Sequence, residues 1–380
     1  MVPFDFQPRT RVVFGQGTFE RLGHLARDLG MRRALVVADP GLIDAGHVPR
    51  AVRLLEATGV EASLFSDFGP NPDSAMVEAG RAAAAAFDPD SVIGLGGGSS
   101  LDCAKGINFL LTNGGSMADY KGYGKASVPL LPMIGVPTTA GTGSEAQSYA
   151  VIADAGTHMK MACGDPSAAV RVAILDPELT LSAPRHVTAM AGYDAIAHAV
   201  ETTATARRTT MSETFSLQAW RLLSDAFERV LLHPADIEAR SAMLIGAHLA
   251  GAAIEQSMLG AAHACANPLT ARYSLPHGLA LAILLPHVVR WNAALAADRY
   301  ALLLGSPRRR ARDEEAPDAL ARRLEDFATA AGLALRLSDS GVEKSALPAL
   351  AAHAAEQWTG TFNPRPFDAA GAMEIYTAAW

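Results

Sequence analysis

The segment Ser91-Val92-Ile93-Gly94-Leu95-Gly96-Gly97-Gly98-Ser99-Ser100 decides the fold class of this chain. The apolar run at 91–95 predicts a buried β-strand, and the glycines after it predict a tight loop that leads into a helix through Asp102 and Lys105. In this order, backbone N–H groups at the helix N-terminus bind a diphosphate. The GxGxxG fingerprint is incomplete, because a count from Gly94 places Ser99 at its last position. A simple strand–helix turn therefore remains an alternative interpretation.

Three further strand-like runs lie in the first half of the chain, at 34–39, 61–65 and 130–136, with helical patterns near 17–30 and 45–58. Strands that alternate with helices predict a largely parallel sheet with helices on both faces. We therefore expect residues 1–183 to form an α/β, Rossmann-like dinucleotide-binding domain.

The second half differs in composition and in hydrophobic pattern. From about residue 186 the sequence is rich in Ala, Leu, Glu and Arg, with apolar residues at helical spacing, as in 212–231 and 236–258. We expect residues 184–380 to form an all-α, metal-binding domain. The charged segment 306–315 predicts a solvated loop between helices. Two domains also suit a chain of 380 residues.

Composition excludes several classes of function. A net charge of −7 and a pI near 5.9 argue against a nucleic-acid or anionic-membrane partner. No apolar run is long enough to predict a membrane span. The three cysteines, Cys103, Cys163 and Cys265, form no CxxC pair, and the N-terminus lacks the pattern of a signal peptide. We therefore expect a cytoplasmic protein that acts on small molecules.

A possible metal site begins at Asp194 and His198, which are four residues apart in a helix-favouring context and should share one helical face. His263 and His277 would complete a set of one carboxylate and three imidazoles, which suits Fe(II) or Zn(II). The alternative is an N-cap aspartate followed by a core histidine.

Polar residues also follow the predicted strands. Asp39 stands where a carboxylate accepts from the ribose hydroxyls of the adenosine and repels a 2′-phosphate, which favours NAD(H) over NADP(H). Thr138 and Thr139 follow another strand, at the edge where open α/β sheets bind ligands. A turn aspartate and a capped turn are the respective alternatives.

Together these motifs resemble the iron-containing (group III) alcohol dehydrogenases. The resemblance rests on 96–99 with Asp102 and Lys105, on 137–145, on Asp194 and His198, and on His263 and 276–278, in this order. It implies a dehydroquinate-synthase-like fold with the active site in a cleft between an α/β and a helical domain. It also implies NAD(H), a divalent ion, most simply Fe(II) with Zn(II) as the alternative, a small alcohol, diol or aldehyde as substrate, and a homodimer or larger homo-oligomer.

The resemblance assigns roles residue by residue. The catalytic metal ligands would be Asp194, His198, His263 and His277. Cofactor-binding residues would be Asp39, Asn71, Gly97, Gly98, Ser99, Asp102, Thr138, Thr139 and Lys160.

One position departs from the pattern of the close relatives, which carry a further histidine four residues after the third ligand. This chain has Asn267 there. Asparagine does not titrate near neutral pH and cannot relay a proton as imidazole does. Water, the ribose hydroxyls, His158 or His287 would then carry the proton, or the substrate differs.

Other functions of the same fold stay open. A glycerol dehydrogenase-like, maleylacetate reductase-like or dehydroquinate synthase-like enzyme would share the fold and the metal. The few basic residues near the metal motifs favour a neutral substrate over a dicarboxylate. A non-catalytic NAD-binding protein is a further alternative, against which the intact metal-ligand motif speaks.

Overall fold

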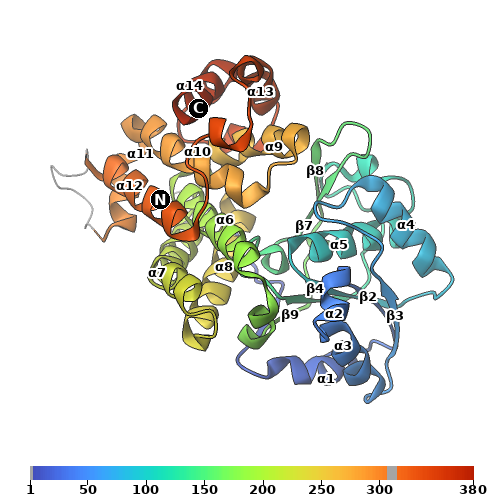
Figure 1. The fold of residues 1–380 in the computed structure, drawn as a ribbon. Helices are drawn as coiled ribbons and strands as arrows, with labels where there is room; N and C mark the ends of the chain where they lie inside the picture. Colours follow the sequence, from blue (N-terminus) through green and yellow to red (C-terminus); the bar gives the residue numbers. More distant parts are fainter. Residues whose placement is uncertain (1–2, 306–314) are drawn as a thin grey trace. The chain divides into compact units, whose positions relative to one another are not determined.

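The computed structural model describes residues 3–305 and 315–380. These residues form two compact units, divided between Ala183 and Pro184 (Figure 1). Residues 3–6 group with the second unit rather than the first. Within this unit the Phe6 ring contacts the ring of Phe215 in α7 (Thr210–Leu232), with their centroids 5.8 Å apart. The charged segment 306–315 lies outside the described residues, apart from Glu315.

A six-stranded sheet forms the centre of the first unit. Its order is β1 (Arg11–Phe14), β9 (Val172–Leu175), β6 (Met133–Pro137), β4 (Ser91–Gly96), β2 (Arg33–Val37) and β3 (Glu61–Phe65). Every neighbouring pair is parallel, so the predicted parallel sheet is confirmed. β6 begins later than expected, because the Leu130 and Leu131 N–H groups donate to the side chains of Ser167 and Asn108 instead of a strand.

Helices cover both faces of this sheet. Val36 and Ile93 point to one face, where they form a core with Leu22 of α1 (Leu22–Asp28) and Leu55 of α3 (His47–Glu56). α5 (Gly98–Asn113) packs against β4 on the other face, and α4 (Ser74–Ala85) contacts both α5 and β3. The short α2 (Pro40–Asp44) follows β2. The α/β class is therefore confirmed.

A second, three-stranded sheet was not predicted. Its order is β5 (Gly122–Tyr123), β8 (Lys160–Gly164) and β7 (Tyr149–Ala153), with β7 and β8 antiparallel. The Lys105 ammonium attaches the start of β7 to α5, because it donates to the carbonyls of Ser144, Gln147 and Tyr149 at 2.7–2.9 Å. Buried Lys105 thus holds the segment that follows β6.

The described part of the second unit is helical and contains no strand. Its α-helices are α6 (Arg185–Ala204), α7, α8 (Ile237–Ser257), α9 (Ala261–Tyr273), α10 (His277–Trp291), α11 (Ala293–Leu303), α12 (Ala316–Ala331), α13 (Leu347–Ala355) and α14 (Ala369–Ala379). α6 is the central helix and packs against α7, α8 and α10. Among the described helices, none alone is long and apolar enough to cross a membrane, and α10 with α11 meets that criterion only as a pair bent by 114°.

Candidate metal centre and dinucleotide-binding edge

Three helices of the second unit place the four predicted metal ligands. Asp194 and His198 lie one turn apart on α6, His263 lies in the first turn of α9, and His277 is the first residue of α10. A glycine brings α10 against α6, because a Cβ added at Gly278 would lie 2.2 Å from the Met190 carbonyl oxygen. The helix that carries His277 therefore begins directly beside the helix that carries Asp194.

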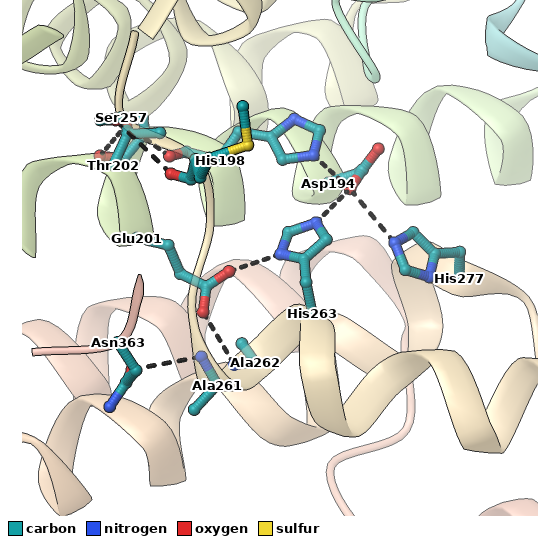
Figure 2. Close-up of polar contacts among 12 residues, drawn as sticks. Asp194, His198, Glu201, Thr202, Ser257, Ala261, Ala262, His263, His277 and Asn363 are labelled. Carbon is teal, nitrogen blue, oxygen red and sulfur yellow. Dashed lines mark hydrogen bonds and ion pairs between the residues drawn. The ribbon is translucent and has the colours of Figure 1, made fainter. Parts of the chain in front are cut away.

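The three histidine side chains converge on one carboxylate oxygen of the fourth residue, Asp194 (Figure 2). Asp194 Oδ1 lies 3.2 Å from His198 Nε2, 3.5 Å from His263 Nε2 and 4.0 Å from His277 Nε2. One ligand atom each from Asp194, His263 and His277 fall within 4.8 Å of one another. The rings of His198 and His263 stack with their centroids 4.8 Å apart. The His277 side chain is 20% exposed, whereas the other three are almost fully buried.

The chemistry of this donor set fits a divalent cation. Among the described residues, neither Asp194 Oδ1 nor His263 Nε2 has a hydrogen-bond partner, although both atoms are buried. The 3.5 Å approach between them lacks hydrogen-bond geometry. Buried polar atoms without partners are costly. Carboxylate oxygens and imidazole nitrogens are ligands that Fe(II) and Zn(II) accept. Asp194, His263 and His277 form the compact cluster, which His198 joins through its 3.2 Å contact with Asp194 Oδ1.

Electrostatics favour a cation at the same point. Burial would raise the pKa of Asp194, but His198, together with His263 and His277, outweighs burial and lowers it. Burial would lower the pKa of His263, but the carboxylates of Glu201 and Asp194 outweigh it and raise the pKa to about 9. The pocket therefore keeps an ionised carboxylate and stabilises positive charge beside it.

Glu201 is a buried carboxylate beside this centre that sequence reasoning missed. Its Oε2 lies 2.5 Å from His263 Nδ1, and its Oε1 accepts the Ala262 N–H at 2.7 Å. A signal was present, because Asp194, His198 and Glu201 are spaced by four and three residues and share one face of α6. The spacing alone could not name His263, 62 residues away, as the partner of Glu201.

The predicted cofactor residues lie in the first unit. Three of them lie just after the carboxyl ends of neighbouring strands. Gly97 directly follows β4, Thr138 directly follows β6, and Asp39 is the second residue after β2. These strands are parallel neighbours, so the three residues share one edge of the sheet. Asp39 is the N-cap residue of α2, and its Oδ2 accepts from the Ser100 hydroxyl at 3.3 Å. The Thr138 N–H donates to the Gly96 carbonyl.

The glycine-rich loop runs from β4 into α5, with Gly97 as the N-cap residue. A Cβ added at Gly98 would lie 2.4 Å from Thr142 Cγ2, so this position requires glycine for the close approach of the following loop. The Ser99 hydroxyl accepts the Asn71 N–H at 3.2 Å. The structure thus brings Asn71, Gly97, Gly98 and Ser99 together, and the Thr139 side chain lies beside Gly97.

Asp102 and Lys160 also belong to the first unit and are partly buried. Asp102 is in the second turn of α5, where the Ser144 hydroxyl donates to its Oδ1 at 2.5 Å. Burial raises the pKa of Asp102, although Lys105, Ser144, Val151 and Lys160 act in the opposite direction. Lys160 is the first residue of β8. In this structure Asp102 therefore connects α5 to the segment that precedes β7.

The departure at Asn267 has a structural partner. Asn267 lies one turn after His263 on α9, buried, and its Nδ2 donates to Gln357 Oε1 at 3.1 Å. His158 belongs to the β7–β8 turn of the first unit. His287 lies ten residues beyond His277 on α10, or about 15 Å along the helix axis. A direct proton relay between His287 and the metal centre does not fit that separation.

Comparison with known proteins identifies the family. A family model described as iron-containing alcohol dehydrogenase matches residues 8–177, and a model described as Fe-containing alcohol dehydrogenase family, C-terminal, matches residues 188–380. The chain belongs to the iron-containing alcohol dehydrogenase family. Membership in this family makes it an alcohol or aldehyde oxidoreductase and confirms the resemblance inferred from its motifs.

Named relatives of this iron-containing alcohol dehydrogenase cover nearly its whole length. It is 32% identical to the NAD-dependent methanol dehydrogenase of Bacillus methanolicus, over 93% of both chains. It is 31% identical to the lactaldehyde reductase of Escherichia coli, over 97% of both. The crystal structure of a 1,3-propanediol oxidoreductase superimposes with a TM-score of 0.95 at 30% identity, over 100% of both chains. The fold of this chain is therefore that of the family.

Proposed function

We propose that this chain is a metal-dependent, NAD(H)-linked dehydrogenase that interconverts a small neutral alcohol or diol and the corresponding aldehyde. The observation that carries the proposal is the buried Asp194 Oδ1, toward which the Nε2 atoms of three histidines point at 3.2, 3.5 and 4.0 Å. Family membership supports the reaction class, and the NAD-dependent relative supports the cofactor.

Each group of residues would have its own task. When bound, the cation supplies Lewis-acid polarisation of the substrate oxygen, and the nicotinamide supplies or accepts the hydride. Asp194, His198, His263 and His277 hold the cation, and their burial strengthens the electrostatic interactions at the centre.

The cofactor-binding residues of the α/β unit would orient the dinucleotide. The N–H groups at the start of α5, around Gly97, Gly98 and Ser99, suit the diphosphate. Asp39 would accept from the ribose hydroxyls and disfavour a 2′-phosphate. Three residues at this edge would also contact the dinucleotide: Asn71, Thr138 and Thr139. We assign Asp102 and Lys160, whose charges interact, to the same cofactor-binding set.

Fe(II) is the ion we propose first, with Zn(II) as the alternative. Three imidazoles and one carboxylate are acceptable to both ions, so the donor set does not separate them. The description of the family favours iron.

The names of the relatives support a small, uncharged substrate, since they act on methanol, lactaldehyde and 1,3-propanediol. Glycerol dehydrogenase-like or maleylacetate reductase-like activity is the alternative within the fold, and efficient turnover of dicarboxylates alone would favour the latter. We also propose a cytoplasmic location, because all three cysteines are buried free thiols. A homodimer or larger assembly stays a prediction, which light scattering tests.

The experiment that tests the proposal is metal analysis of anaerobically purified protein, paired with NADH-dependent reduction of a panel of small aldehydes. We expect one equivalent of metal per chain, loss of activity on chelation, and recovery on adding Fe(II) or Zn(II). The ion that restores activity at one equivalent identifies the metal. Activity that is indifferent to chelation would contradict the proposal.

A further inference from the structure

The N-terminus of α9, which carries His263, has no cap of its own. Its N-cap residue is Gly260, which has no side chain, and the first helical residues are Ala261 and Ala262. The first N–H groups of a helix need acceptors from outside the helix. Here Glu201 Oε1 accepts from Ala262 at 2.7 Å, and Asn363 Oδ1 accepts from Ala261 at 3.2 Å (Figure 2).

The two capping side chains differ in what else they do. Asn363 pairs with Asn292 through two hydrogen bonds of 2.8 and 3.1 Å, and among the described residues it makes no hydrogen bond to the four candidate metal ligands. Glu201 uses its second oxygen on His263 Nδ1, at 2.5 Å. Their fit is close, because a Cβ added at Gly260 would lie 2.9 Å from Asn363 Oδ1 and 3.0 Å from Glu201 Oε1.

The contact with Glu201 determines which nitrogen of His263 keeps its proton when the other nitrogen binds a cation. An ionised carboxylate only accepts hydrogen bonds, so Nδ1 must donate to it. The remaining nitrogen, Nε2, faces Asp194 Oδ1 at 3.5 Å, and a bound cation would take the place of a proton there. A carboxylate on the far nitrogen of a ligating histidine fixes the ring and increases its basicity.

Charge balance supports the same role. With a divalent ion bound in place of the histidine protons, three neutral imidazoles and the Asp194 carboxylate would leave one positive charge uncompensated. The Glu201 carboxylate, 5% exposed, supplies the second negative charge within the same buried region. A buried centre of zero net charge avoids the desolvation cost of an unpaired buried ion.

We propose that Glu201 is a positioning residue that fixes the tautomer and orientation of His263 and thereby tightens divalent-metal binding, while it also caps α9. The inference rests on the proposed metal-dependent function. Both Glu201 oxygens are engaged, so its effect passes through His263 rather than through contact with substrate.

The test compares Glu201→Gln with Asn363→Ala in the full-length protein. A glutamine side chain has one accepting oxygen and one donating NH₂ group, so it cannot accept from both Ala262 and His263. Asn363→Ala removes the other acceptor at the same helix terminus and leaves the Glu201–His263 contact in place. Zn(II) affinity is measured by competition with a chromophoric chelator, and thermal unfolding of the metal-free proteins reports the loss of each cap.

We expect Glu201→Gln to weaken Zn(II) binding roughly 10- to 100-fold, and Asn363→Ala to leave it within about threefold of wild type. A downfield imidazole N–H signal of the zinc-loaded protein, absent from His263→Ala, should also disappear in Glu201→Gln. Zinc affinity of Glu201→Gln equal to wild type, or an equal loss in Asn363→Ala, would overturn the inference.

These outcomes separate the two proposals. Wild-type protein that binds no divalent ion would refute the metal-dependent function, and the inference with it. Wild-type protein that binds one ion, loses it in His263→Ala, and keeps it in Glu201→Gln would refute only the role of Glu201.

Discussion

The candidate dinucleotide-binding edge of the α/β unit and the candidate metal centre of the helical unit differ in how their polar groups are satisfied. At the edge, the polar groups already satisfy one another, as in the Asp39–Ser100 and Asn71–Ser99 hydrogen bonds. At the metal centre, Asp194 Oδ1 and His263 Nε2 are buried without a hydrogen-bond partner among the described residues. The edge groups are therefore hydrogen-bonded without a ligand, whereas a bound cation would give a partner to both of these atoms at the candidate metal centre.

The largest expected effect tests this difference at the metal centre. His277→Ala removes the most exposed of the four ligands, so the fold should survive while metal binding fails. Lewis-acid stabilisation amounts to several kcal/mol, so we expect kcat/KM to fall by ~10³-fold or more. The measurements are metal content, circular dichroism and NADH-dependent aldehyde reduction.

His287→Ala is the matched control, because His287 lies on the same helix, α10, but far from Asp194. It should keep wild-type metal content and activity within about twofold, as expected of a substitution away from the site. A folded His277→Ala protein with wild-type activity would remove that residue from the centre. Equal losses in both variants would point to a general effect on α10.

The sequence predicts the glycine-loop region from local patterns, but it predicts the full set of metal ligands only in part. The strand, the glycine loop and the helix at 91–113 are contiguous, so local patterns fixed their order, and the structure places β4 and α5 there. Asp194 and His198 are one turn apart, so periodicity placed them on one face. That His263 and His277 join them depends on how α9 and α10 pack against α6, which no local pattern encodes; the resemblance supplied it.

The partners of Glu201 could not be predicted from the sequence. Its position on α6 was readable, but its two partners lie 61 and 62 residues away, at the start of another helix. β7 and β8 were missed for a related reason, because short strands of alternating burial in a small separate sheet leave a weak sequence pattern. The grouping of residues 3–6 with the helical unit is likewise tertiary, and Phe6 contacts Phe215 there, more than 200 residues along the chain.

A methyl group added at Gly98 tests whether the glycine-rich loop binds NADH. Gly98→Ala would place a methyl group 2.4 Å from Thr142 Cγ2, and overpacking of this kind costs about 1–3 kcal/mol. Displacement of the loop should raise KM for NADH about tenfold and leave metal content unchanged, since one tenfold change corresponds to about 1.4 kcal/mol. Steady-state kinetics with varied NADH checks this.

Thr142→Ala is the companion substitution, because it removes the two atoms nearest to the added methyl group. The double variant should recover part of the lost NADH affinity. Metal loss in Gly98→Ala would contradict the prediction that the edge and the candidate metal centre can be altered independently.

The smallest expected effect concerns the charge of Asp39. Asp39→Asn keeps the size of the side chain and an oxygen that accepts from Ser100, but it removes the negative charge that would repel a 2′-phosphate. Two charges about 4 Å apart in water interact by about 1 kcal/mol, so the ratio of kcat/KM for NADPH to that for NADH should rise about fivefold. Because exposed charges are screened by salt, the shift should shrink as ionic strength increases. An unchanged ratio at low salt would leave Asp39 as an acceptor for the Ser100 hydroxyl, with no part in the choice of cofactor.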